Sequence, residues 1–314
     1  MLKRALSKMP GPAIVLAILA LVTAVLGKAS APSSAASSGT IWGVYSESQN
    51  GLSGAQVTQQ LQSTMGRAFA GQRVYTAMSL RLPQSQDKDA AAAGRLIYHN
   101  LNSWYLVGGV KTCYPWADVA AGKQDAILVQ RAAELKAWGY DKIVLGFHHE
   151  PTVNKANEPS CGSPSDYRAA YHHVVQVFRA QGITYPWAWT MTASSYKNGT
   201  AGLYQPPGSD FDFVGVDGYN RASRWLTPSQ KFQAAMTYAE TAGKPLFIGE
   251  IGSEELPGDP TAKATWITTA TAMFEAYGNV KAIMWTNGDT YRLDSSPQAL
   301  AAFVAAGKDA YYSP

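Results

Sequence analysis

Residues 142–150, KIVLGFHHE, decide the fold of this chain. An uninterrupted apolar run, Ile143–Phe147, is followed directly by three polar residues. A strand that is apolar throughout, rather than at every second position, is typical of a parallel sheet covered by helices on both faces. The polar residues then stand at the carboxyl end of the strand, where the active sites of α/β barrels lie.

Seven further runs of this kind alternate with longer amphipathic segments. They are Ile41–Ser46, Arg73–Leu80, Ser103–Val110, Tyr185–Thr192, Asp212–Asn220, Pro245–Gly252 and Ala282–Gly288. Eight β–α units in about 275 residues match the size and order of a (β/α)₈ barrel. The rival, a doubly wound open sheet, usually has a glycine-rich loop after its first strand, and residues 45–48 (YSES) are not one. The sequence therefore predicts a single-domain TIM barrel over residues 41–314.

Helical periodicity fills most of the segments between the strands. We expect helices over Gly122–Tyr140, Asp166–Ala180 with Ser165 as its cap, Thr227–Gly243, Pro260–Tyr277 and Pro297–Ala306. Residues 193–211 have no apolar stripe, so the fifth helix is expected to be short or missing.

Two carboxylates stand at the predicted carboxyl ends of strands. Glu150 ends the fourth run and Glu250 lies in the seventh, within GEIGS. A pair on one rim suits glycoside cleavage, in which one carboxyl protonates the leaving oxygen and the other stays ionised. Aromatic residues near them would offer flat apolar faces to sugar rings.

Four motifs in order resemble glycoside hydrolase family 26. They are HHEP at 148–151, GVDGYN at 215–220, KPLFIGEIGS at 244–253 and KAIMWTN at 281–287. The family contains β-mannanases and some β-glucanases and xylanases, all (β/α)₈ retaining enzymes. The resemblance implies that this chain is a polysaccharide hydrolase working by double displacement.

The resemblance also assigns roles to residues. It implies that Glu150 is the general acid/base and Glu250 the nucleophile, held ionised by Tyr219. The expected sugar-binding residues are His149, Tyr219, Asp217, Trp189 and Trp285, with Trp285 under the −1 sugar. For Asp217, a purely structural role is equally open.

Two departures from the family lie near Glu150. Family mannanases usually have Met-Asn-Gly after this glutamate, where this chain has Pro151-Thr152-Val153. They often have arginine four residues before it, where this chain has Gly146. Both positions touch the sugar subsites, so mannan, β-glucan and related β-linked polymers all stay open as substrates.

Other readings of the same residues remain open. Neighbouring strand residues point to opposite faces, so we expect His148 to be packed and His149 to face the site. A non-catalytic carbohydrate-binding barrel would keep the aromatic groove, although binding does not require two carboxylates. A glycosidase that remodels exopolysaccharide or cell wall, held at the membrane, would share every motif. The sequence contains no G-x-S-x-G elbow, phosphate loop or Cys/His zinc cluster, so no metal or other cofactor is expected.

The N-terminus accounts for the net charge of +4. Four basic residues and no acidic ones lie in residues 1–31, which combine a basic start, the apolar run Ala13–Leu26 and an A-x-A site. This is the layout of a secretory signal peptide, although an uncleaved anchor is an alternative. Residues 32–40 are expected to be a linker. The remainder has 22 basic and 22 acidic residues, which gives no reason to expect nucleic acid as a partner and suits a neutral polysaccharide substrate. We expect a secreted enzyme that acts as a monomer.

Only two cysteines occur in the chain, Cys113 and Cys161. In an exported protein such a pair is a candidate disulfide, with two separate buried thiols as the alternative.

Overall fold

A computed structural model of the chain describes residues 39–153 and 160–312. The predicted signal peptide, residues 1–31, and most of the predicted linker lie outside these ranges. Thr40, expected at the end of the linker, is buried, and its hydroxyl donates a hydrogen bond to the carbonyl of Val280 at 2.8 Å. Among the described residues, no helix is both long enough and apolar enough to cross a bilayer.

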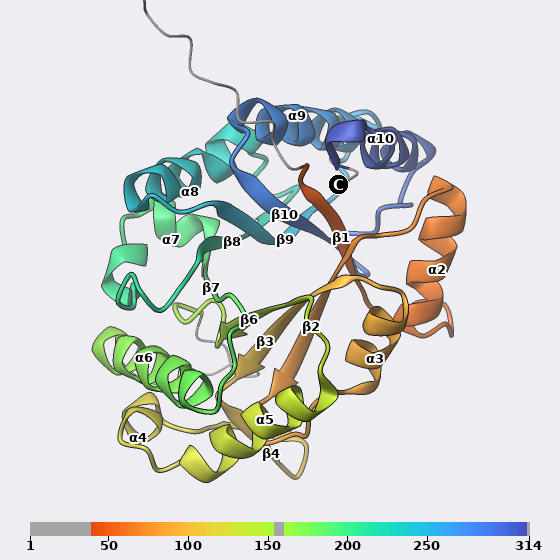
Figure 1. Cartoon of the computed structure of the whole chain (residues 1–314). Coiled ribbons are helices and arrows are strands. Elements are labelled where there is room, and N and C mark those ends of the chain that lie inside the picture. Colours follow the sequence, from red (N-terminus) through yellow and green to blue (C-terminus); the bar gives the residue numbers. More distant parts are fainter. Residues whose placement is uncertain (1–38, 154–159, 313–314) are drawn as a thin grey trace, which may run out of the picture. The chain divides into compact units, whose positions relative to one another are not determined.

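Eight parallel strands form a barrel, which confirms the predicted fold (Figure 1). They are β1 (Ile41–Ser46), β2 (Gly71–Ala77), β3 (Leu96–Asn102), β6 (Ile143–Phe147), β7 (Ala188–Thr192), β8 (Phe213–Asn220), β9 (Leu246–Ser253) and β10 (Val280–Asn287). Their order is β6-β3-β2-β1-β10-β9-β8-β7. The circle closes between β6 and β7, where the amide of Leu145 donates to the carbonyl of Pro186 at 2.8 Å.

Helices surround the barrel and connect its strands (Figure 1). They are α2 (Gly54–Met65), α3 (Ser85–Ala92), α4 (Trp116–Ala120), α5 (Asp125–Trp138), α6 (Pro164–Ala180), α7 (Ala193–Lys197), α8 (Pro228–Ala242), α9 (Ala262–Tyr277) and α10 (Pro297–Gly307). The fifth β–α unit has only the five-residue α7 and a short 3₁₀ turn, which confirms the prediction. Thr227 caps α8 as expected, but the side chain that caps α6 is Ser163 and not Ser165.

The third barrel strand is not the one that the sequence predicted. The predicted run, Ser103–Val110, contributes to a two-stranded hairpin outside the barrel, made of β4 (Trp104–Val107) and β5 (Val110–Cys113). The barrel strand is β3, LIYHNLN, which is paired with β2 and β6. β3 has three buried polar residues, His99, Asn100 and Asn102, so its sequence does not look like a buried strand.

Side chains alternate between the barrel interior and the layer beneath the helices. The inner cluster contains Tyr98, Val144, Ala188, Phe247, Ala282 and Met284. Their neighbours along the strands point outward and pack on helices, as Ile143 and Ile283 do. This alternation decides which strand residues reach the site.

A disulfide joins Cys113 to Cys161, as predicted, with Cα atoms 5.4 Å apart. It connects the end of β5 to the segment that leads into α6. Both partners therefore belong to connections on the carboxyl side of the barrel strands.

Candidate active site

Glu250 reaches the barrel interior because β9 contains a bulge. Phe247 points inward, so strict alternation would turn Glu250 outward. The register with β8 shifts at this point: Val216 is paired with Ile248, but Asp217 is paired with Glu250. The extra residue is Gly249, and a β-carbon there would lie 2.5 Å from Oδ1 of Asp217. Only glycine fits the bulge without a shift of its neighbours, and the bulge turns Glu250 toward Asp217.

The carboxylate of Glu250 accepts hydrogen bonds on both oxygens. The hydroxyl of Tyr75 donates to Oε1 at 2.6 Å, and the hydroxyl of Tyr219 donates to Oε2. Tyr219 also contacts the hydroxyl of Thr286 at 3.0 Å. The guanidinium of Arg73 lies 3.5 Å from Oε1. Since 9% of the Glu250 side chain remains exposed, the carboxylate is fixed and still reachable.

The surroundings of Glu250 keep it ionised. Burial raises the pKa of its carboxyl, but the charge that His149 carries when it is protonated at acid pH, the permanent charge of Arg73 and the hydrogen bonds from Tyr219 and Tyr75 outweigh burial. The net effect is a pKa below the ordinary value. Glu250 is therefore the anionic member of the site, as a nucleophile must be.

Asp217 is the neutral carboxyl beside it. Burial raises the pKa of Asp217 well above its ordinary value, and the charge of Glu250 raises it further, while Arg73 lowers it. The guanidinium of Arg73 lies 3.8 Å from Oδ2 of Asp217 and stacks 3.7 Å from the ring centroid of Tyr98. One negative charge thus lies on the two carboxyls, opposite one permanent cation.

The turn after β6 positions Glu150. His148 and Glu150 both have positive φ, 41° and 52°, which is a strained conformation for residues other than glycine. Hydrogen bonds hold the turn: the amide of His148 donates to Leu101, that of His149 to Asn100, and that of Glu150 to Thr190. Three consecutive amides are satisfied by neighbouring strands, so the turn is firmly anchored.

The two histidines of this turn separate as predicted. His148 is buried, its Nδ1 lies 2.6 Å from the hydroxyl of Ser103, and its ring packs against Trp116. His149 instead places Nε2 3.4 Å from Oε1 of Glu250. Burial lowers the pKa of His149 to about 4, with Arg73 acting in the same direction and Glu250 against it. His149 is therefore neutral at pH 7.

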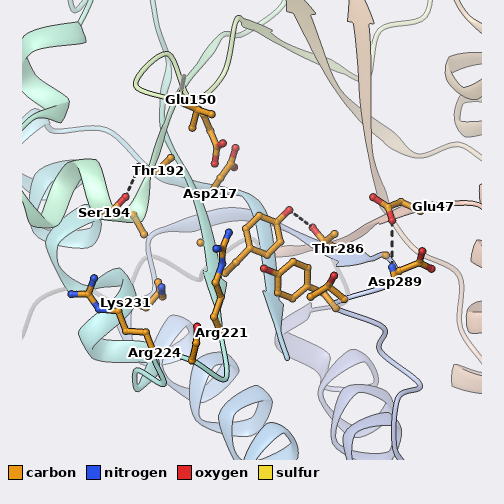
Figure 2. Close-up of a pocket in the computed structure, with 18 residues that line it drawn as sticks. Glu47, Glu150, Thr192, Ser194, Asp217, Arg221, Arg224, Lys231, Thr286 and Asp289 are labelled. Carbon is orange, nitrogen blue, oxygen red and sulfur yellow. Dashed lines mark hydrogen bonds between the residues drawn. The ribbon is translucent and has the colours of Figure 1, made fainter. Parts of the chain in front are cut away.

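A cleft of about 690 Å³ lies over this site. Glu150, Asp217 and Tyr219 line it, and the side chains of Glu150 and Asp217 point toward each other in Figure 2. Tyr291 lines it too and stacks on Tyr219, with ring centroids 4.4 Å apart. The cleft therefore brings together the carboxyls of Glu150 and Asp217, the tyrosine that donates to Glu250, and aromatic surface.

Comparison with known proteins agrees with this geometry. No protein-family model matches the chain. Its sequence is 33% identical to endoglucanase H of Acetivibrio thermocellus over 61% of this chain and 23% of that protein, so the chain spans about a quarter of its relative. A GH26 β-mannanase from Bacteroides ovatus superposes with a TM-score of 0.60 at 13% identity, covering 87% of this chain and 89% of the other.

A second solved structure, GH26C from a Muricauda species, gives a TM-score of 0.61 at 14% identity, covering 87% of this chain and 86% of the other. The chain has the fold of glycoside hydrolase family 26. The resemblance inferred from the four motifs is confirmed.

Two residues expected in the site of this family 26 fold lie elsewhere. Trp285 is fully buried and packs against Trp42 and Phe303, under α10. Its inward neighbour, Thr286, is the residue that lines the cleft. Trp189 is likewise fully buried, under α7 and α8. The alternation of the strands turns both tryptophans outward, so neither forms a wall for sugar, and that expectation is corrected.

The site also contains two residues that sequence reasoning missed, Arg73 and Tyr75 on β2. An arginine and a tyrosine two positions apart face the same side of a strand, and that spacing within a predicted strand was the available signal. Where family members often have arginine, this chain has Gly146, whose added β-carbon would lie 3.0 Å from the hydroxyl of Tyr98. The guanidinium beside the carboxylates comes from β2 instead.

A metal ion does not fit the inner cluster well. His149, Asp217 and Glu250 offer ligand atoms within 4.8 Å of one another. However, the Arg73 guanidinium already lies within 4 Å of both carboxyls, so a divalent ion would meet a buried positive charge. The residues present match acid–base and nucleophilic chemistry better than a metal centre.

Proposed function

We propose that this protein is a retaining endo-β-glycanase that hydrolyses β-linked glucan, mannan or a related polysaccharide. The observation that carries the proposal is the environment of Glu250, which is buried, doubly hydrogen-bonded by tyrosines and ionised. A binding site has no need to hold a carboxylate ionised against burial, whereas a nucleophile does.

The reaction follows from the placement of the two glutamates. In the first step, a Glu250 oxygen attacks the anomeric carbon, the glycosidic C–O bond breaks, and Glu150 gives its proton to the leaving oxygen. In the second step, Glu150 takes a proton from water, the water oxygen attacks the same carbon, and the bond to Glu250 breaks. Two inversions leave the anomeric configuration unchanged.

The polymers proposed as substrates are those named for the similar proteins. The similar protein of known sequence is named an endoglucanase, and the structural neighbours include β-mannanases, one of them solved with a gluco-manno-oligosaccharide. We further propose that the protein acts outside the cell, in line with the signal-like residues 1–31, and that it does so as a monomer.

Product analysis tests the proposal. Mixed-linkage β-glucan, glucomannan and xylan are incubated with the protein, and reducing ends and product anomers are followed by NMR. We expect internal cleavage with retention, and Glu250→Ala should lower turnover by more than about 1000-fold. Glu275→Ala, an exposed glutamate on α9, is the matched control. Inverted products, or full activity in Glu250→Ala, would overturn the mechanism.

A further inference from the structure

One end of the cleft has a concentration of positive charge. Four residues form it: Lys197 at the end of α7, Arg221 and Arg224 after β8, and Lys231 on α8. We call them the cationic cluster. Arg221, Arg224 and Lys231 line the main cleft, and Lys197, Arg224 and Lys231 line a small adjoining cavity of about 90 Å³. Figure 2 shows the three main-cleft members together, away from Glu150.

The charge of the cluster is not neutralised within the described part of the chain. There, none of its four members lies within 4.0 Å of a carboxylate, whereas Lys123, Arg131 and Arg292 each form an ion pair. Burial lowers the pKa of Lys231, and the charges of Arg224, Arg221 and Lys197 lower it further. Folding thus brings like charges together against their mutual repulsion. A bound anion would offset this repulsion.

The loop that carries the two arginines is held in place. The amide of Arg224 donates to the carbonyl of Arg221 at 3.1 Å, closing a tight turn. The amide of Ala222 donates to Glu254 at 2.7 Å, and that of Leu226 to Asn220 at 2.9 Å. The backbone that carries the two guanidinium groups is therefore fixed, so binding a ligand does not require this loop to be ordered first.

The opposite end of the cleft has the opposite sign. Glu47 follows β1 and Asp289 follows β10, and the amide of Asp289 donates to Glu47 at 3.3 Å. Both line the cleft, on the side opposite the cluster in Figure 2. A chain lying across the site therefore meets cations at one end and carboxylates at the other. A neutral glycan has no use for this polarity, but a charged one is oriented by it.

We propose that the cationic cluster is a subsite for an acidic sugar, so that the preferred substrate is a β-glycan bearing carboxylate groups. This inference rests on the proposed function and narrows its substrate class. The acidic sugar lies against Arg221, Arg224 and Lys231 while the scissile bond lies between Glu150 and Glu250. Guanidinium groups suit this task because they form paired hydrogen bonds with a carboxylate.

The test compares charged and uncharged forms of one polymer. Carboxymethyl glucomannan and carboxymethyl β-glucan place carboxylates at many positions along the chain, and the unmodified polymers are the references. Binding is measured by retardation in native gels containing each polymer, using the full chain with Glu250→Ala so that no turnover occurs. We expect stronger retardation by the carboxymethyl forms, lost at about 1 M salt, where the screening length is roughly 3 Å.

Variants test whether the cationic cluster causes the preference for carboxymethyl polymers. Arg224→Gln with Lys231→Gln should weaken binding of the carboxymethyl polymers by roughly threefold to tenfold relative to the unmodified ones. Arg221 is left intact because it contacts the phenol of Tyr291, which stacks on Tyr219. The control, Lys88→Gln with Lys136→Gln, changes the net charge equally on exposed helix positions. If both pairs lose the same affinity, or if no form is preferred, the inference is wrong.

Hydrolysis separates this inference from the proposed function. Cleavage of unmodified polymers without a preference for acid would overturn the acidic subsite and leave the glycanase intact. Selective binding of the carboxymethyl polymers without cleavage of any polymer by the unsubstituted protein would overturn the glycanase. Faster cleavage of the carboxymethyl forms, reduced in the Arg224→Gln/Lys231→Gln variant, supports both.

Discussion

At the scale of single residues, the protonation of the site follows from a few contacts. Glu250 receives two tyrosine hydroxyls and faces Arg73, while Asp217 has the same cation at a longer distance and no described donor to its oxygens. The carboxyl of Glu250 is therefore stabilised in its ionised form, and the carboxyl of Asp217 in its protonated form. Two groups of the same type acquire different roles through their surroundings alone.

Tyr75→Phe tests the ionisation of Glu250. The change removes a donor to the charged form, so the pKa of Glu250 rises and the acid limb of kcat/KM moves to higher pH. A hydrogen bond to a charged group contributes roughly 1.5–3 kcal/mol, which corresponds to about one to two pH units. The pH dependence of glucomannan hydrolysis measures the shift. The control is Tyr277→Phe, because the Tyr277 hydroxyl donates to the carbonyl of Met236 and not to the site. This variant should leave the acid limb at the pH of the parent. If the acid limb lies at the same pH in both variants, the assignment is contradicted.

Asp217 offers a separate test, because its two substitutions differ. A protonated carboxyl donates a hydrogen bond, and Asp217→Asn keeps a donor of the same shape, whereas Asp217→Ala removes it. We expect the asparagine variant to stay within about tenfold of the parent and the alanine variant to lose roughly 100-fold in kcat. Initial rates on one soluble polymer suffice for the comparison. Equal losses in both variants would mean that Asp217 acts as an anion.

At the scale of secondary-structure elements, the bulge in β9 has the greatest consequence. Strict alternation from Phe247 would send Glu250 outward, and the extra residue Gly249 reverses it. Close packing of Gly249 against Asp217 and Tyr98 leaves no room for a side chain. The sequence GEIG therefore specifies where the carboxylate points as well as which residue bears it.

Gly249→Ala should damage both stability and activity. Its β-carbon would lie 2.5 Å from Oδ1 of Asp217 and 3.1 Å from the ring of Tyr98, so either these buried side chains or the strand must shift. Overpacking of this kind costs about 1–3 kcal/mol, or a fall in Tm of roughly 2–10 °C. Gly208→Ala, with nothing within 4 Å, is the control. A Gly249→Ala protein with the parent's Tm and rate would show that the bulge is not required.

Elements were predictable where propensity and burial agree. Seven of the eight strand assignments overlap barrel strands, and Thr227 and Gly243 bound α8 as expected. The third assignment failed because the hairpin sequence 103–110 is aromatic and β-branched, whereas β3 buries His99 and Asn100. Nδ1 of His99 lies 2.7 Å from Oδ1 of Asp87, a tertiary contact that no local pattern reveals.

Motifs in the sequence identified residues of the site, but they did not show which way the side chains point. Glu150, Glu250, His149 and Tyr219 belong to motifs, and all four lie at the site. Motifs do not state which face a residue occupies, so Trp285, adjacent to Thr286, was placed on the wrong side. The cationic cluster was missed for a related reason: its members come from three segments, and only folding brings them together.

At the scale of the whole molecule, the site is assembled from connections that the barrel alone does not fix. Glu150 lies between β6 and α6, and Cys161 lies in that same connection. The disulfide to Cys113 ties this connection to the hairpin that follows β3. A covalent bond therefore joins two neighbouring loops on the carboxyl side of the barrel, one of which carries the proposed acid/base.

Removal of the disulfide should lower both the free energy of unfolding and kcat. Cys113→Ser with Cys161→Ser frees a 48-residue loop, which by the chain-entropy estimate costs about 4 kcal/mol. Urea unfolding under oxidising conditions measures the loss, and the variant should match the reduced parent, with no further response to reductant. Because the bridge supports the Glu150 connection and not the Glu250 contacts, kcat should fall while the acid limb set by Glu250 stays in place. An unchanged urea midpoint, or a moved acid limb, would show that the bridge does not act on the site in this way.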